Sequence, residues 1–249
     1  MAEKTSSSFG NGASESLALI VDDRMLSTQR NYAAIVRPYT EDFGDDHRHL
    51  EDFIDPMLSI IAGINLDGPF IDLGSGPGNV VDYLLKKKVS SDIIAVDFVE
   101  GFCQNLSEKY KPSSNVRVVN DNFVEFIAKQ SDNSVAAYTA GFSIIHIPKE
   151  KIDPLFTDIT RTLKPGGLFF FSVYEGMDKG MVPEPYQEDK DSRLDVTERL
   201  EAYMNNFQSN ELNERLESVG MKKVKLMVVN DGKPGEYSNS KIFGLFQKK

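Results

Sequence analysis

The sequence is poor in several features on which other classes of protein depend. Cysteine occurs once among 249 residues, as Cys103, so no disulfide can form within the chain and no cysteine-based zinc cluster can be built. No apolar run approaches the length of a membrane span. The N-terminus also lacks a cationic region followed by an apolar stretch, the pattern of a secretion signal. We therefore expect a cytoplasmic protein that does not enter a membrane.

Positive charge is also scarce. Lysine and arginine number 28 against 38 aspartates and glutamates, which gives a net charge of −10 and a pI near 4.9. Such a balance argues against a broad electrostatic footprint for the phosphates of DNA or RNA. The sequence therefore favours a small-molecule substrate, or a protein one, and predicts no nucleic-acid partner.

The length and patterning predict a single α/β domain. Residues 1–16 are rich in Ser, Gly and Ala without apolar periodicity, and we expect them to be disordered. Residues 17–249 then form the domain, with a helical cap over the carboxyl edge of the sheet at 17–66 and an insertion after the fifth strand at 176–207. The cap prediction rests on helical spacing from Asp23 to Ala62.

Apolar runs alternate with helical segments along the middle of the chain, which predicts βαβ units and a parallel, doubly wound sheet. Strands are expected near 69–73, 92–97, 115–119, 134–140 and 167–174, with helices near 78–88, 99–109, 122–129 and 150–162. A further helix should begin with Ser209 as its N-cap and stop at Gly220. Strands near 222–229 and 241–247, joined through turn candidates at 230–232 and 234–235, predict an antiparallel pair.

A glycine-rich turn follows the first predicted strand, in the segment Phe70–Asn79. Glycine at 74, 76 and 78 permits positive φ and removes Cβ atoms, so the backbone can turn sharply and lie against a ligand. The spacing is G-x-G-x-G, whereas a dinucleotide fingerprint reads G-x-G-x-x-G. A glycine turn without a ligand is the alternative at this point.

Together with Asp72 before it, this turn resembles motif I of the class I S-adenosylmethionine-dependent methyltransferases. The segment Leu163–Leu168, with the sequence LKPGGL, resembles the turn that precedes strand five in that family. The resemblance implies a Rossmann-like methyltransferase fold with a seven-stranded mixed sheet. It also implies S-adenosylmethionine as cofactor, S-adenosylhomocysteine as product, and these cofactor-binding residues: Asp72, Gly74, Ser75, Gly76, Gly78, Asp97, Phe98, Asp121, Asn122, Phe123 and Tyr32.

The resemblance gives several of these residues a role. Asp97, at the end of the second strand, would accept hydrogen bonds from both hydroxyls of the adenosine ribose, although it could instead cap the helix that follows. Asp121 would lie against the adenine amino group, and an N-cap of the next helix is an equal alternative. Phe98 and Phe123 would enclose the adenine, unless they are ordinary core residues.

The segment Ser143–Pro148 resembles the family's motif IV region and contains His146, our candidate catalytic residue. With an intrinsic pKa of ~6.5 its imidazole could deprotonate a substrate, or it could only hydrogen-bond locally and shape the loop. We expect no metal site, because the histidines and acids of segment 41–49 match no metal template and indicate a solvated helix start. The substrate pocket is expected to involve four aromatic residues, with plain packing as their alternative: Tyr39, Tyr186, Tyr203 and Phe207.

The sequence thus predicts an enzyme that transfers a methyl group from S-adenosylmethionine to an O, N or C atom of a small molecule by in-line displacement. Two alternatives are a nicotinamide-dependent oxidoreductase and a non-catalytic binding module that retains the methyltransferase fold. The oligomeric state is left open.

Overall fold

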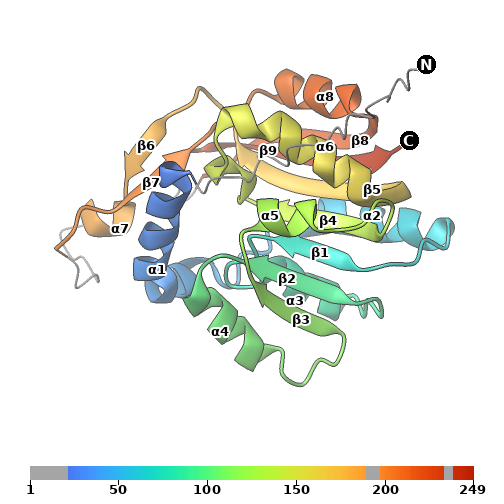
Figure 1. The fold of residues 1–249 in the computed structure, drawn as a ribbon, viewed down its shortest axis with the longest axis horizontal. Helices are drawn as coiled ribbons and strands as arrows, with labels where there is room; N and C mark the ends of the chain where they lie inside the picture. Colours follow the sequence, from blue (N-terminus) through green and yellow to red (C-terminus); the bar gives the residue numbers. More distant parts are fainter. Residues whose placement is uncertain (1–21, 189–196, 233–237) are drawn as a thin grey trace, which may run out of the picture.

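The structure is a computed structural model that describes residues 22–188, 197–232 and 238–249. The segment 1–16, which we expected to be disordered, lies outside the described residues. The described chain folds around a seven-stranded sheet with helices on both faces, as Figure 1 shows.

The sheet has the order β3-β2-β1-β4-β5-β9-β8. The five strands β3, β2, β1, β4 and β5 run parallel to one another, whereas β9 is antiparallel to both β5 and β8. The strands are β1 (Phe70–Leu73), β2 (Ile93–Asp97), β3 (Val116–Asn120), β4 (Val135–Gly141), β5 (Leu163–Tyr174), β8 (Met221–Asn230) and β9 (Ser240–Lys248). The predicted mixed, doubly wound sheet with an antiparallel final pair is confirmed.

Both faces of the central strands are buried, because a parallel sheet with βαβ crossovers carries helices on each side. Every residue of β1 and β2 is buried, which explains why these segments are continuous apolar runs. The helices after the strands are α3 (Asn79–Lys86), α4 (Glu100–Lys109), α5 (Phe123–Ala128), α6 (Ile152–Thr162) and α8 (Ser209–Ser218), with short 3₁₀ turns η1 (Ile144–His146) and η2 (Lys149–Lys151) before α6.

The ends of α8 test two expectations about capping. Gly220 has φ +93° just beyond the helix, so the predicted glycine stop is confirmed. The predicted N-cap is wrong by one position: the helix already includes Ser209, and Gln208 occupies the N-cap in an extended conformation without a side-chain hydrogen bond. A serine at the first helical position has helical backbone angles, so it cannot form the cap.

The N-terminal helices occupy two different places. Helix α1 (Asp23–Phe43) lies across the carboxyl ends of β1 and β2 (Figure 1). Helix α2 (Leu50–Gly63) instead packs against β5, β9 and α3, and its Phe53, Ile54 and Met57 are buried. The cap over the sheet edge is therefore made by α1, whereas the apolar stripe of α2 covers a sheet face.

The segment after β5 completes the cover beside α1. It contains β6 (Gly180–Pro183), α7 (Pro185–Glu188) and β7 (Glu201–Met204), and β6 pairs with β7 in a separate antiparallel ribbon. Strand β7 packs on α1, where the Tyr203 N–H donates to Thr28 Oγ1 at 2.9 Å. The carboxyl edge of the sheet is thus enclosed by α1 and this ribbon. No helix among the described residues has the length and apolar content needed to cross a bilayer.

Candidate functional site

The glycine turn between β1 and α3 presents bare backbone at the carboxyl edge of the sheet. All three glycines have positive φ, at +69° for Gly74, +48° for Gly76 and +94° for Gly78. A Cβ on Gly74 would lie 2.5 Å from Ser143 Cβ, and one on Gly78 would lie 2.3 Å from Tyr110 Oη. No atom lies within 4 Å of a Cβ placed on Gly76, so this middle glycine faces open space. Packing requires the outer two glycines, and the middle one leaves room for a ligand.

Two buried carboxylates flank this turn. Asp72 is 2% exposed and accepts a hydrogen bond from Thr139 Oγ1 at 2.7 Å. Asp97 accepts from the Gly76 N–H at 2.8 Å and from the Val99 N–H at 2.9 Å. Burial raises the pKa of each carboxyl to about 6, although these hydrogen bonds act in the opposite direction. Asp97 therefore shapes the glycine turn directly, and the paired β1 and β2 bring both acids to one place.

Two adjoining cavities open at this edge. The Asp97 cavity has about 630 Å³ of empty space and includes Phe98, Asn122 and Phe123 in its wall. The Asp72 cavity has about 1000 Å³, open mouth included, and lies on the other side of the turn. Both cavities share the following wall residues: Tyr32, Tyr39, Gly74, Gly76, Gly141 and Phe142.

Most of the predicted cofactor residues are brought together around these cavities. Ser75 is in the wall of the Asp72 cavity, and Gly78 anchors the start of α3 behind it. Asn122 lines the Asp97 cavity while its side chain caps α5 by accepting from the Val124 N–H at 3.0 Å. Asp121 is placed differently. Its carboxylate pairs with Lys129 Nζ at 3.0 Å and lines a separate surface depression, so its contact with adenine stays a prediction.

His146 and Tyr32 form a hydrogen-bonded pair at the junction of the cavities. Because a carbonyl only accepts, the 2.8 Å contact to Tyr203 O requires a proton on Nδ1 of His146. Nε2 of the neutral ring then accepts from the Tyr32 hydroxyl at 3.0 Å. Burial lowers the pKa of His146 to about 4, against the opposing effect of the bond to Tyr203. The imidazole is therefore neutral near pH 7, with its lone pair on Nε2.

The four aromatic residues predicted for a substrate pocket separate in the structure. Tyr39 lines both cavities, whereas the other three are absent from both walls. Phe207 is fully buried in the core, and the Tyr186 hydroxyl donates to Asp42 at 2.7 Å. Tyr203 contributes its backbone carbonyl to His146, and its ring lies beside the guanidinium of Arg24.

Several wall residues of the Asp72 cavity were not predicted. Phe142 adopts φ +52°, uncommon for an aromatic residue, with its N–H directed at Ser172. Phe142 is the first residue after β4, and its place at the end of a predicted strand could have marked it in the sequence. Six further wall residues come from distant segments and have no such signal: Arg48, His49, Tyr174, Asp231, Lys241 and Phe243.

His49 shows why part of this wall was missed. Its segment was interpreted as a solvated helix start: His49 is indeed the N-cap of α2, but its side chain is only 25% exposed. Its Nε2 lies 2.9 Å from Asp231 Oδ2, and its ring packs against Phe243 with centroids 5.0 Å apart. Within the described ranges, no group of three or more His, Cys, Asp or Glu side chains is arranged to hold a metal ion.

A family model described as a methyltransferase domain matches residues 70–167, from the glycine turn to the LKPGGL turn. Residues 70–167 are thus identified as a methyltransferase domain of the class I S-adenosylmethionine-dependent type. The protein is a methyltransferase that uses S-adenosylmethionine, so the nicotinamide and non-catalytic alternatives are set aside.

One relative of this methyltransferase is the carboxy-S-adenosyl-L-methionine synthase of Nautilia profundicola. The two are 29% identical over 169 residues, which cover 63% of this chain and 70% of the relative.

Solved structures share the fold of this methyltransferase. The S-adenosylmethionine-dependent methyltransferase of Clostridium acetobutylicum aligns with a TM-score of 0.61 at 14% identity, over 87% of this chain and 98% of the other. The 1,6-didemethyltoxoflavin-N1-methyltransferase of Burkholderia thailandensis, solved with its substrate and S-adenosylhomocysteine, aligns with a TM-score of 0.54 at 16% identity, over 89% and 90% of the two chains. At these identities the likeness concerns the fold.

The residues present in this methyltransferase fit its cofactor. Ser143 is 7% exposed and lies in the wall of the Asp97 cavity. Its hydroxyl oxygen has no hydrogen-bond partner among the described residues. A buried hydroxyl without a partner is costly, and a polar ligand would satisfy it. Asp72 and Asp97 add negative charge on either side of a bare glycine backbone, which suits a cofactor with cationic amino and sulfonium groups.

Proposed function

We propose that this enzyme transfers the methyl group to an O, N or C atom of a small molecule, with His146 as the group that receives a proton. The observation that carries the proposal is the Tyr32–His146 pair. Tyr32 lies in the walls of both cavities and is hydrogen-bonded at 3.0 Å to an imidazole nitrogen that can accept a proton.

The proposed cofactor residues divide into three groups. When bound, S-adenosylmethionine supplies a methyl group activated by its sulfonium. Asp97, with Phe98 and Phe123 beside it, would hold the adenosine, and the Gly74–Gly78 backbone with Asp72 would hold the methionine end. These side chains bind and orient, so the enzyme's contribution is to align the acceptor and exclude water.

His146 suits proton removal because its two ring nitrogens have different partners. The Tyr203 carbonyl accepts from Nδ1 and keeps the basic lone pair on Nε2, directed at the Tyr32 hydroxyl. With a pKa of about 4 the imidazole is neutral over the physiological range. The unprotonated ring would accept a proton from the acceptor's nucleophile, either directly or through Tyr32, as the methyl group is transferred, acting as a weaker base than a free imidazole because its pKa is lowered.

The walls of the Asp72 cavity support a small acceptor. Tyr32 and Tyr39 of α1 line this cavity opposite the glycine turn, together with the aromatic rings of Phe142, Tyr174 and Phe243, and such walls are typical of small-molecule sites. The net charge of −10 gives no support to a nucleic-acid substrate. The single thiol, Cys103, is buried and free, which supports a cytoplasmic setting.

Incubation of the protein with methyl-labelled S-adenosylmethionine and fractionated small metabolites tests the proposal. Mass spectrometry should find one labelled product together with an equal amount of S-adenosylhomocysteine. The His146→Gln variant should form this product about 100-fold more slowly. Label found only in protein or nucleic acid, or a carboxylated cofactor of the kind that the Nautilia relative's name describes, would contradict a small-molecule acceptor.

A further inference from the structure

Lys241 is a charged residue in a place where the fold would accept an apolar one. It is 1% exposed, and it is the only lysine or arginine among the buried residues of the described chain. Its neighbours Ile242 and Phe243 on β9 are core residues. Burying an ammonium group costs several kcal/mol unless it is paired. Two of the other three buried acidic or basic residues, Asp72 and Asp97, belong to the cofactor site, which suggests that Lys241 also has a function.

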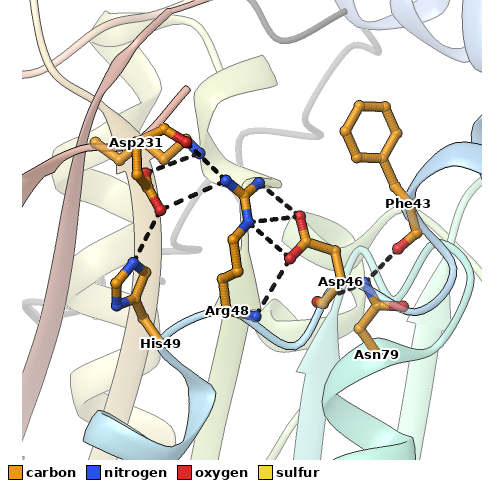
Figure 2. A network of polar contacts seen from close by, with 7 residues as sticks. Phe43, Asp46, Arg48, His49, Asn79 and Asp231 are labelled. Carbon is orange, nitrogen blue, oxygen red and sulfur yellow. Dashed lines mark hydrogen bonds and ion pairs between the residues drawn. The ribbon is translucent and has the colours of Figure 1, made fainter. Parts of the chain in front are cut away.

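Three nitrogen donors from separate segments converge on one carboxylate, that of Asp231. Lys241 Nζ lies 3.1 Å from Oδ1, and His49 Nε2 lies 2.9 Å from Oδ2. Arg48 Nη1 lies 3.4 Å from Oδ2 and also donates to the Asp231 carbonyl at 2.7 Å. Figure 2 shows Arg48 and His49 both directed at the Asp231 side chain. The structure thus contains a carboxylate-binding site with a carboxylate in it.

This site is part of the wall of the Asp72 cavity, to which all four residues contribute. The donors are held independently of Asp231. Asp46 binds the Arg48 guanidinium through Nε at 2.8 Å and Nη2 at 2.6 Å, as Figure 2 shows. His49 is packed on Phe243, and Lys241 is fixed by the pairing of β9 with β5. The donor geometry would therefore persist without Asp231.

Asp231 has the most exposed side chain of the cluster, at 30% against 27% for Arg48 and 25% for His49. It follows the last residue of β8, Asn230, and belongs to no helix or strand. Its side chain is 30% exposed, compared with 1% for Lys241. A partly exposed side chain outside helices and strands can rotate outward at a lower cost than a buried strand or helix side chain.

We propose that the methyl acceptor carries a carboxylate that takes the place of Asp231 between Arg48, His49 and Lys241. The inference rests on the proposed function, because it assigns the Asp72 cavity to the acceptor. Exchange of one carboxylate for another leaves the charge of the cluster unchanged, so the donors need no new counterion. A cationic acceptor at this wall would instead face the like charges of Arg48 and Lys241, which is unfavourable.

The body of such an acceptor would lie on an apolar wall. Phe142 and Tyr174 pack together with ring centroids 5.0 Å apart, and Phe142 and Phe243 meet at 5.9 Å. All three line the same cavity as Lys241. The combination fits a planar or aromatic carboxylate, with the acid at the cationic site and the ring against these side chains.

The test uses benzoate and its neutral analogue benzamide as probes, each titrated by calorimetry in the presence and absence of S-adenosylhomocysteine. Benzoate should bind at millimolar concentration, and benzamide should bind about tenfold more weakly or not at all, since a charge-assisted hydrogen bond contributes ~1.5–3 kcal/mol. The Lys241→Met variant should lose about tenfold in benzoate affinity. The control Lys223→Met, an exposed lysine on neighbouring β8, should leave it unchanged.

The Asp231→Ala variant gives the decisive result, because the two explanations of this residue predict opposite signs. If Asp231 is a displaceable occupant, its removal strengthens benzoate binding by about tenfold. Unchanged or weaker binding would mean that Asp231 is a fixed structural partner, and the inference would be wrong, as it would be if benzamide bound as well as benzoate. S-adenosylhomocysteine titrated into the same proteins reports separately on the proposed function, and the benzoate result stands whether or not that cofactor binds.

Discussion

Replacing Asp97 with Asn should separate cofactor binding from stability. Burial raises the pKa of this carboxyl from 3.8 to about 6, so at pH 8 the fold bears an ionised group that it disfavours by ~3 kcal/mol, at 1.36 kcal/mol per pKa unit. Asn removes that cost. It also loses one of the two hydrogen bonds from Gly76 N and Val99 N, which costs ~1–3 kcal/mol. The free energy of unfolding at pH 8 should therefore change by less than ~2 kcal/mol.

Cofactor affinity should respond very differently. A carboxylate that accepts from two ribose hydroxyls makes two charge-assisted bonds of ~1.5–3 kcal/mol each. The Asp97→Asn variant should bind S-adenosylhomocysteine at least ~100-fold more weakly, as measured by calorimetry. Asp92→Asn is the matched control, because Asp92 is exposed and precedes the opposite end of β2. An affinity within about threefold of the wild-type value would refute the ribose assignment.

The raised pKa of Asp97 also predicts the direction in which the free energy of unfolding changes with pH. Because the folded pKa of about 6 exceeds the ordinary aspartate pKa of 3.8, the folded state holds more protons between these values. Stability from this group is present below pH 3.8 and is lost as the pH rises through 6. Urea unfolding across this range should show a decline that is ~3 kcal/mol smaller in Asp97→Asn. An equal decline in both proteins would mean that Asp97 is not the buried acid responsible.

Three further outcomes follow from the site. Because His146 is neutral with a pKa of about 4, kcat at saturating cofactor should show no histidine inflection near pH 6.5; an inflection removed by His146→Gln would contradict the buried, neutral ring. Gly74→Ala should lower the unfolding free energy by ~2–5 kcal/mol in urea titration, because it combines positive φ with a Cβ 2.5 Å from Ser143 Cβ, and a wild-type midpoint would show that the turn can relax. Phe123→Ala should weaken S-adenosylhomocysteine binding by about tenfold through lost contact with the adenine, and unchanged affinity would assign Phe123 to the core alone.

The predictable part of this protein is local in sequence. The glycine spacing at 74, 76 and 78 and the apolar run before it depend on neighbouring residues, so the turn and its strand were predicted. Asp97 was located because β1 and β2 are consecutive units of a parallel sheet, whose strand ends meet at one edge. The hairpin of β8 and β9 was likewise predicted from strand patterns separated by turn residues.

The acceptor side could not be predicted in the same way. The local sequence does not show which side of an irregular segment an aromatic side chain faces. Tyr186, Tyr203 and Phe207 were therefore assigned to a pocket whose walls do not include them. Tyr203 instead acts through its carbonyl, which binds His146. A backbone atom leaves no trace in the identity of its residue, so this contact was visible only in the structure.

The sequence by itself determined the glycine turn and the position of the acids that flank it, because both are set by spacing within one sheet edge. Only the tertiary structure decided what faces that turn. His49 and Asp231 lie 182 positions apart, and Lys241 reaches the cavity because β9 is inserted antiparallel beside β5. The burial of a lysine and the convergence of three donors on one carboxylate arise from this long-range pairing, which no local pattern in the chain encodes.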